Sequence, residues 1–282
     1  INAGLDMIMI PFDYKSFIAT VTKAVELGDI TMARIDDAVA RILRAKFLLG
    51  LFEKPISDES YLKHFGSAEH RALAREAVQK SAVLLKHDNH ALPLKPSGVI
   101  GVAGIGANDI GLACGGWTIV WQGVAGPITA GATLLDGLLE HLGNHVNYSA
   151  TGDFEEKIDT AVVVVGEEPY AEGEGDREDL TLSAEDTALI QKVRGKCQKL
   201  ILVVYSGRPI IITHVLDQCD AIIAAFLPGS EAAGVADVLV GKAPFTGKLS
   251  YTWFKSMSQL PLSHLVASGE APLYPFGHGL SL

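Results

Sequence analysis

Acidic side chains crowd a short stretch that follows a buried-strand pattern. The segment GEEPYAEGEGDRED, residues 166–179, carries seven Asp and Glu residues together with Pro169, Tyr170 and three glycines. It follows the apolar run AVVVV directly. Crowded carboxylates raise one another's pKa, and partial burial has the same effect. Because a carboxyl group that keeps its proton near neutral pH can act as a general acid, this stretch predicts acid/base chemistry.

Two simpler interpretations of the acidic stretch are a solvated turn and a calcium loop. The calcium spacing D-x-[DN]-x-[DN]-G is absent from residues 166–179, which disfavours the calcium loop. Ligands of open α/β sheets bind beyond the carboxyl ends of strands, and the stretch lies at such an end. Its position therefore favours a functional site over a solvated turn.

A second candidate is the segment CGGWTIVWQG, residues 114–123. The pair Gly115-Gly116 leaves the backbone before Trp117 uncrowded, so this indole can point outward. An exposed indole suits the apolar face of a sugar ring, which makes Trp117 a candidate ligand platform. The simpler interpretation is core packing, and we expect that role for Trp121.

Other patterns give weaker signals. The turn GVAGIGAND resembles a dinucleotide fingerprint, but Asp109 stands where the third glycine belongs. The pairs His87/His90 and His141/His145 lack further ligands nearby, and the cysteines form no C-x-x-C motif. We therefore predict no metal and no cofactor.

Composition narrows the class of protein. The chain has 282 residues, 48% of them hydrophobic, and a net charge of −10. This acidity disfavours nucleic acid as a partner, because phosphate binding needs a basic face. No apolar run approaches the length of a membrane span, so no membrane partner is expected. The first residues, INAGLDMIMIP, read as the middle of a longer protein.

The order of elements predicts two parts. Residues 6–11 resemble a buried strand, and helical stretches follow over 14–27 and 32–52. This first part is too small to close a core alone. A polar, proline-containing stretch follows as a linker, and 67–86 reads as one long helix.

Apolar, β-branched runs dominate the second part. They end in glycine-containing turns and alternate with helical stretches, at 99–106, 161–167, 199–207 and 221–229. This alternation predicts a mostly parallel sheet covered by helices on both faces. The amphipathic segment 247–253 is expected to add an edge strand.

Several long and uncommon motifs resemble one family. They are GEEPYAEGEGD, CGGWTIVWQG, AGLDMIMIP, RIDDAVARIL, AREAVQKSAVLLK, FLPGSEAAGVADVLVG and PFTGKLSYTW. Together they resemble glycoside hydrolase family 3, in its β-D-glucan exohydrolase and β-glucosidase branch, over essentially the whole chain. The resemblance implies an αβα sandwich with a mostly parallel sheet, preceded by the last strand and helices of an incomplete (β/α)8 barrel.

The resemblance also implies residue roles. Glu172 matches the glutamate acid/base of the G-E-x-P-Y-x-E loop, and Trp117 matches the tryptophan on the leaving-group side. Glu167 matches the first glutamate of that loop, and we expect it to order the loop through backbone N–H groups. We expect Pro169 and Tyr170 to stiffen and partly cover the acid. The implied activity is retaining hydrolysis of β-glucosides and β-glucan oligosaccharides from the non-reducing end.

The chain departs from the family pattern at its first domain. It contains no S-D-W segment, in which the family carries its aspartate nucleophile. Residues 1–48 match only the C-terminal remnant of the barrel, 49–60 read as a linker, and 61–282 form the sandwich domain. The missing barrel is thus the expected partner, and the chain alone is expected to be inactive.

Two other interpretations stay open. One is a carbohydrate-binding or interaction module without catalysis, and the other is a nucleotide-binding α/β domain. The family suggests an extracellular, cell-wall or periplasmic location.

Overall fold

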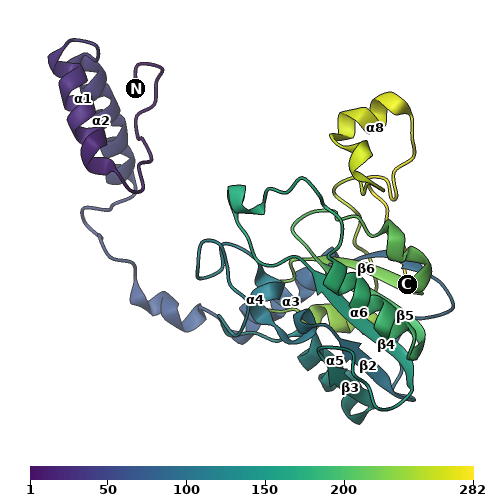
Figure 1. Ribbon diagram of the computed structural model, residues 1–282. Helices are drawn as coiled ribbons and strands as arrows, with labels where there is room; N and C mark the ends of the chain where they lie inside the picture. The colour runs from purple at the N-terminus through teal and green to yellow at the C-terminus, as the bar shows by residue number, and fades with distance from the viewer. The chain divides into compact units, whose positions relative to one another are not determined.

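The computed structural model describes residues 1–282, which separate into two compact units. The first unit spans Ile1–Phe65 and the second spans Gly66–Leu282. Figure 1 follows the chain through both units. None of the helices combines the length and the apolar character needed to cross a membrane.

The first unit is helical. It contains helices α1 (Tyr14–Glu26) and α2 (Met32–Leu48) and the short 3₁₀ helix η1 (Glu59–His64). Asp13 and Thr31 cap α1 and α2 by accepting hydrogen bonds from backbone N–H groups of the first turn. These caps and the helical periodicity explain why both predicted helices form.

The strand predicted at residues 6–11 is wrong, because no strand forms there. Met7 and Met9 are 80% and 88% exposed. A strand is stabilised by hydrogen bonds to a neighbouring strand, and the first unit contains none. Ala38 is the one buried hydrophobic residue of this unit, so little apolar surface is removed from water here.

We predict that backbone amides of residues 1–48 exchange rapidly with solvent in the monomeric 282-residue chain. The physical reason is the poor burial of α1 and α2, which leaves few tertiary contacts to oppose local opening. Hydrogen exchange measures this directly, with the amides of the central strand 158–166 as the protected internal control. Strong protection throughout residues 1–48 would contradict the prediction.

The second unit is an α/β sandwich around a six-stranded sheet, with strand order β1-β6-β5-β4-β2-β3 (Figure 1). The strands are β1 (Val83–His87), β2 (Ile100–Ala103), β3 (Val146–Ser149), β4 (Ile158–Gly166), β5 (Cys197–Tyr205) and β6 (Ala221–Phe226). The helices are α3 (Ala68–Ser81), α4 (Ile110–Cys114), α5 (Leu134–Leu142), α6 (Ala184–Arg194), α7 (Ala233–Leu239) and α8 (Leu262–Ser268). Short 3₁₀ helices are η2 (Ile105–Asn108), η3 (Gly143–His145), η4 (Glu172–Gly175), η5 (Thr213–Gln218) and η6 (Met257–Gln259).

Only β1 pairs antiparallel, with β6, and every other strand pair is parallel. The predicted mostly parallel sheet is therefore confirmed. The strand runs expected from the sequence at 99–106, 161–167, 199–207 and 221–229 correspond to β2, β4, β5 and β6.

Two predicted elements differ in the structure. The helix expected over 67–86 ends at Ser81, and residues 83–87 form the edge strand β1. Val83 and Leu85 face one core while Leu84 faces the other, so consecutive apolar residues are buried with the period of a strand. The segment 247–253 forms no strand. It instead buries Trp253 completely, and the indole Nε1 donates to the carbonyl oxygen of Ile210 at 2.8 Å.

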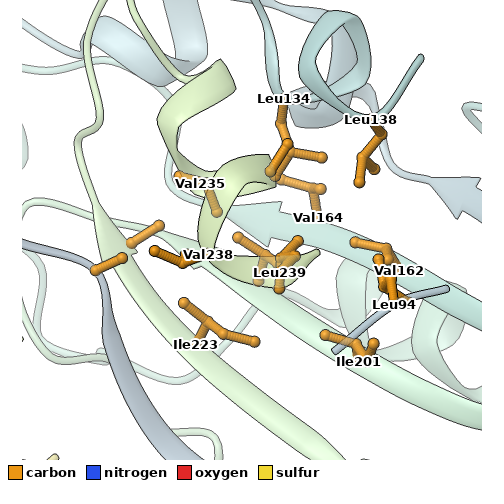
Figure 2. Packing of buried hydrophobic residues seen from close by; sticks show 14 of the residues in the cluster. Leu94, Leu134, Leu138, Val162, Val164, Ile201, Ile223, Val235, Val238 and Leu239 are labelled. Carbon is orange, nitrogen blue, oxygen red and sulfur yellow. The ribbon is translucent and has the colours of Figure 1, made fainter. Parts of the chain in front are cut away.

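Hydrophobic packing holds both faces of the sheet. On one face, α5 and α7 pack against β4, β5 and β6, and Figure 2 shows residues of this cluster, among them Leu134, Leu138, Val162, Val164, Val235 and Leu239. The opposite face packs against α6, with Val163 and Val165 alternating with the first set along β4. This double burial explains why β4 and β5 read as uninterrupted apolar runs.

A buried ion cluster joins α3, α5 and α7. The carboxylate of Asp237 is completely buried and accepts hydrogen bonds from Arg75 (2.6 and 2.7 Å) and Gln79 (2.6 Å). Nε2 of His141 lies 2.7 Å from Oδ1 of the same carboxylate. Burial would raise the pKa of Asp237, but these hydrogen bonds outweigh it and lower the pKa to about 2.

We expect Asp237→Ala to lower the free energy of unfolding by about 3–5 kcal/mol, because it leaves the charge of Arg75 without its buried partner. The contribution of Asp237 to the free energy of unfolding is present above its ordinary pKa of 3.8. It is lost as the pH falls from about 4 toward 2, where the folded-state carboxylate takes up a proton. Urea unfolding at several pH values measures both effects. The exposed Asp217→Ala is the control, and equal stability of the two variants would contradict the prediction.

Candidate active site

The two candidate loops leave the sheet from neighbouring strands. β2 and β4 lie side by side, β3 lies beyond β2, and β5 lies beyond β4, so the chain changes direction across the sheet between β2 and β4. Such a topological switch point leaves a crevice at the carboxyl ends of the strands. The segment with Trp117 follows β2 after η2 and α4, and the acidic loop follows β4 directly. The connections that carry the two loops therefore both start at this crevice.

The carboxylate of Glu167 is the centre of a polar network at the end of β4. Its side chain is only 6% exposed. It accepts hydrogen bonds from Arg208 (2.8 and 3.1 Å), Arg177 (2.9 Å) and the hydroxyl of Tyr170 (3.1 Å). Two guanidinium groups therefore compensate one buried charge. Arg208 holds Glu167 at the start of the acidic loop, and Arg177 connects the end of the loop to the same carboxylate. The expectation that Glu167 orders the loop through backbone N–H groups is wrong, because its carboxylate contacts are to side chains.

Tyr170 packs inside the acidic loop. The guanidinium carbon of Arg208 lies 4.7 Å from the centre of its ring. Burial, and then the nearby charge of Glu167, raise the pKa of Tyr170 to about 12, so the phenol stays protonated and donates. A β-carbon on Gly175 would lie 2.2 Å from this ring, which explains the glycine there. Tyr170 thus packs within the loop, and its hydroxyl donates to Glu167. That it stiffens the loop stays a prediction.

Glu172 lies at the start of η4 and is exposed. The sequence predicts partial cover for this carboxyl group, and in the described chain that prediction is wrong. Its backbone has a φ of 52°, in the left-handed region that non-glycine residues seldom adopt. The amide N–H of the preceding Ala171 donates to Oε1 of Gln122 at 2.7 Å.

The predicted exposure of Trp117 is confirmed, with 69% of the residue accessible. Trp121 was expected in the core, and that expectation is wrong, because it is 48% exposed. The two indoles are tilted by 52° with ring centres 6.2 Å apart. Trp117 and Ile119 both have positive φ angles of about 60°, which form the tight turn that brings the two rings together.

The tryptophan loop and the acidic loop pack against each other. A β-carbon on Gly116 would lie 2.1 Å from the carbonyl oxygen of Tyr170, so only glycine permits this approach. The hydrogen bond between Gln122 and Ala171 adds a polar contact. Two segments about fifty residues apart in sequence are therefore held as one surface.

A cavity of about 800 Å³ opens at the same end of the sheet. Its lining includes residues from the ends of β2, β4 and β5 and from α6, among them Gly104, Glu167, Tyr170, Asp186, Lys192 and Tyr205. Trp117 and Glu172 are not part of this lining. Acidic side chains outnumber basic ones in it, five to three, which disfavours a phosphate-bearing ligand. No group of three or more His, Cys, Asp or Glu side chains is arranged to hold a metal ion.

The sequence analysis missed three residues of the site, namely Gln122, Arg177 and Arg208. A signal for Arg208 existed, because this residue directly follows the strand run 199–207 and so lies at the same edge of the sheet. Gln122 gave no such signal, since its partner is a backbone N–H group in another loop.

Comparison with known proteins matches two segments of the chain to two domains of one family. Residues 82–282 match the glycosyl hydrolase family 3 C-terminal domain, and residues 1–45 match the family 3 N-terminal domain. The chain is 29% identical to the lysosomal beta glucosidase of Dictyostelium discoideum and 30% identical to the periplasmic beta-glucosidase of Salmonella typhimurium. It is covered completely in both comparisons, but it spans only 38% and 44% of those proteins.

Solved structures agree in fold. The exo-1,3/1,4-beta-glucanase of a Pseudoalteromonas species is 40% identical with a TM-score of 0.88, covering 99% of this chain and 37% of that one. The beta-glucosidase of Listeria innocua, solved in complex with glucose, is 25% identical with a TM-score of 0.83, covering 99% and 42%. Because the family's C-terminal domain accounts for the sheet and for both loops at its edge, the chain belongs to glycosyl hydrolase family 3.

Proposed function

We propose that this chain forms the acid/base part of a retaining β-glucosidase or β-glucan exohydrolase. The observation that carries the proposal is the joint position of the two loops. They belong to the connections that follow the adjacent strands β2 and β4, and they pack together, with Glu172 and Trp117 exposed for a partner surface and a substrate. The names of the relatives, β-glucosidases and an exo-β-glucanase, support β-glucosides and β-glucan oligosaccharides as the substrate class.

The proposed mechanism is a double displacement. A carboxylate nucleophile on the barrel attacks the anomeric carbon while Glu172, as a carboxylic acid, donates its proton to the departing glycosidic oxygen. The Glu172 carboxylate then takes a proton from water, which attacks the glucosyl-enzyme and releases glucose with retained configuration. Trp117 stacks on the leaving-group sugar, and Glu167 keeps the loop in place through its two arginines.

The proposed mechanism needs a barrel domain, because the nucleophile lies there. We propose that residues 1–48 are the C-terminal remnant of the (β/α)8 barrel, that 49–60 are the linker, and that 61–282 are the sandwich domain. The match of residues 1–45 to the N-terminal domain supports the first assignment. The exposed carboxyl of Glu172 is then covered by the barrel, which supplies the dry surroundings that a general acid needs. The lysosomal and periplasmic relatives support a periplasmic, cell-wall or extracellular location.

The test uses a barrel-joined protein, in which the part of the Pseudoalteromonas glucanase that precedes the counterpart of residue 1 is joined to this chain, so that residues 1–45 complete the N-terminal domain. We expect it to release glucose from laminaribiose, and we expect NMR to detect the β-anomer first. A barrel-joined protein that folds but hydrolyses neither laminaribiose nor a nitrophenyl β-glucoside would contradict the proposal.

A carbohydrate-binding module without catalysis is the second candidate. The exposed pair Trp117 and Trp121 favours it, because aromatic platforms bind sugars without any chemistry. It requires that laminaribiose raises the melting temperature of the 282-residue chain and that Trp117→Ala abolishes the rise. Sugar binding of this kind together with an inactive barrel-joined protein would favour the module over the enzyme.

A further inference from the structure

The backbone of Glu172 is held in an unfavourable conformation. Its φ of 52° lies in the left-handed region, which is unfavourable for a residue with a side chain. Glu172 and Gly173 are both exposed, so packing of their own side chains does not hold them. Such a conformation persists only where neighbouring residues fix the chain on either side.

The contact that fixes the N-terminal side comes from the tryptophan loop. Ala171 is 4% exposed, and its N–H donates to Oε1 of Gln122 at 2.7 Å. On the C-terminal side, the N–H of Asp176 donates to the carbonyl oxygen of Gly173 at 3.0 Å within η4. Gln122 is thus the long-range hydrogen-bond partner that lies nearest to Glu172 along the backbone.

We propose that Gln122 is a positioning residue that holds Glu172 in its working conformation through Ala171. We call the hydrogen bond between Gln122 and Ala171 the clamp. Because Gln122 belongs to the same loop as Trp117, the clamp also couples sugar binding by Trp117 to the position of Glu172. A sugar that shifts the tryptophan loop on the leaving-group side moves the anchor of the acid at the same time. The mechanistic part of this inference rests on the proposed role of Glu172, whereas the clamp itself does not.

The clamp is tested in the 282-residue chain by NMR-detected hydrogen exchange. Gln122→Met keeps the side-chain length but has no oxygen acceptor, and Gln122→Glu keeps an acceptor of equal reach. We expect the Ala171 amide to exchange about tenfold faster in Gln122→Met, the factor that corresponds to one hydrogen bond. It should stay close to the parent rate in Gln122→Glu.

The control is Gln191→Met, a change of the same chemistry at an exposed position of α6. The melting temperature should be equal in all four proteins, which separates a local clamp from general unfolding. An unchanged Ala171 rate in Gln122→Met would overturn the proposal, and so would equal acceleration in Gln122→Met and Gln122→Glu.

The positioning role is tested in the barrel-joined protein. Gln122→Met is expected to lower kcat for laminaribiose about tenfold with little change in KM. It should lower kcat/KM for a dinitrophenyl β-glucoside less, because this value reports the first step, in which that leaving group needs no proton. A rise in KM with unchanged kcat would overturn the positioning role. If Glu172→Ala itself shows no leaving-group dependence, the proposed function fails, while the exchange experiment still decides the clamp.

Discussion

Replacing Glu172 by alanine in the barrel-joined protein is expected to lower turnover of laminaribiose by about 10²–10⁴-fold, the contribution typical of general acid catalysis. The sugar that leaves is a poor leaving group, so the glycosidic oxygen needs a proton as the bond breaks. A dinitrophenyl β-glucoside should lose far less in the first step, because its phenolate leaves unaided. Values of kcat/KM for the two substrates, which report the steps up to departure of the leaving group, measure the difference.

The matched control for this prediction is Glu174→Ala. Glu174 lies in the same 3₁₀ helix, two residues further on, and is also exposed. Glu174→Ala also removes one carboxyl group from this loop. It therefore reproduces any effect of net charge but leaves Glu172 in place. Equal rates of Glu172→Ala and Glu174→Ala on laminaribiose would contradict the assignment.

Glu167→Ala should behave differently from Glu172→Ala. It leaves Arg177 and Arg208 without their shared carboxylate and frees the hydroxyl of Tyr170. We therefore expect a lower melting temperature and a loss of activity that is similar for good and poor leaving groups. If the loss of activity depends on the leaving group in Glu167→Ala but not in Glu172→Ala, then Glu167 is the acid/base and Glu172 is not.

The second large effect concerns the 282-residue chain by itself, which is expected not to hydrolyse a nitrophenyl β-glucoside. It lacks the S-D-W segment that supplies the nucleophile in the family, so the first displacement has no attacking group. Enzymes accelerate reactions by at least about 10⁶-fold, so the contrast with the barrel-joined protein is easy to measure.

Contaminating glucosidase is the main risk in that measurement, and Glu172→Ala of the 282-residue chain controls for it. Residual turnover that is equal in both preparations belongs to the contaminant. Turnover at enzymatic rates that disappears in Glu172→Ala would contradict the prediction and would require a nucleophile within these 282 residues.

Much of the sheet could be predicted from the sequence because its strands are buried on both faces. A strand such as β4 then reads as a continuous apolar run that needs no knowledge of its neighbours. Edge elements are harder, because their conformation depends on the partner. Residues 83–87 continue the composition of α3 but pair with β6, whereas residues 6–11 have a strand's composition and no partner.

The site shows the same division between local and long-range information. The acidic loop and Trp117 stand out because their composition and glycines are unusual, and each follows a recognisable strand. The contacts that organise them are long-range, such as Arg208 on Glu167, forty-one residues away, and Gln122 on Ala171. Pairings of this kind follow from the strand order, which the sequence alone does not specify.

The most direct test of Glu172 as the acid/base is azide rescue in the barrel-joined Glu172→Ala protein. With a dinitrophenyl β-glucoside the nucleophile still forms the glucosyl-enzyme, but no base activates water to release the sugar. Azide needs no base, so it should raise the steady-state rate and give β-glucosyl azide, identified by NMR. Absence of rescue in Glu172→Ala, or formation of β-glucosyl azide by Glu167→Ala alone, would contradict the assignment.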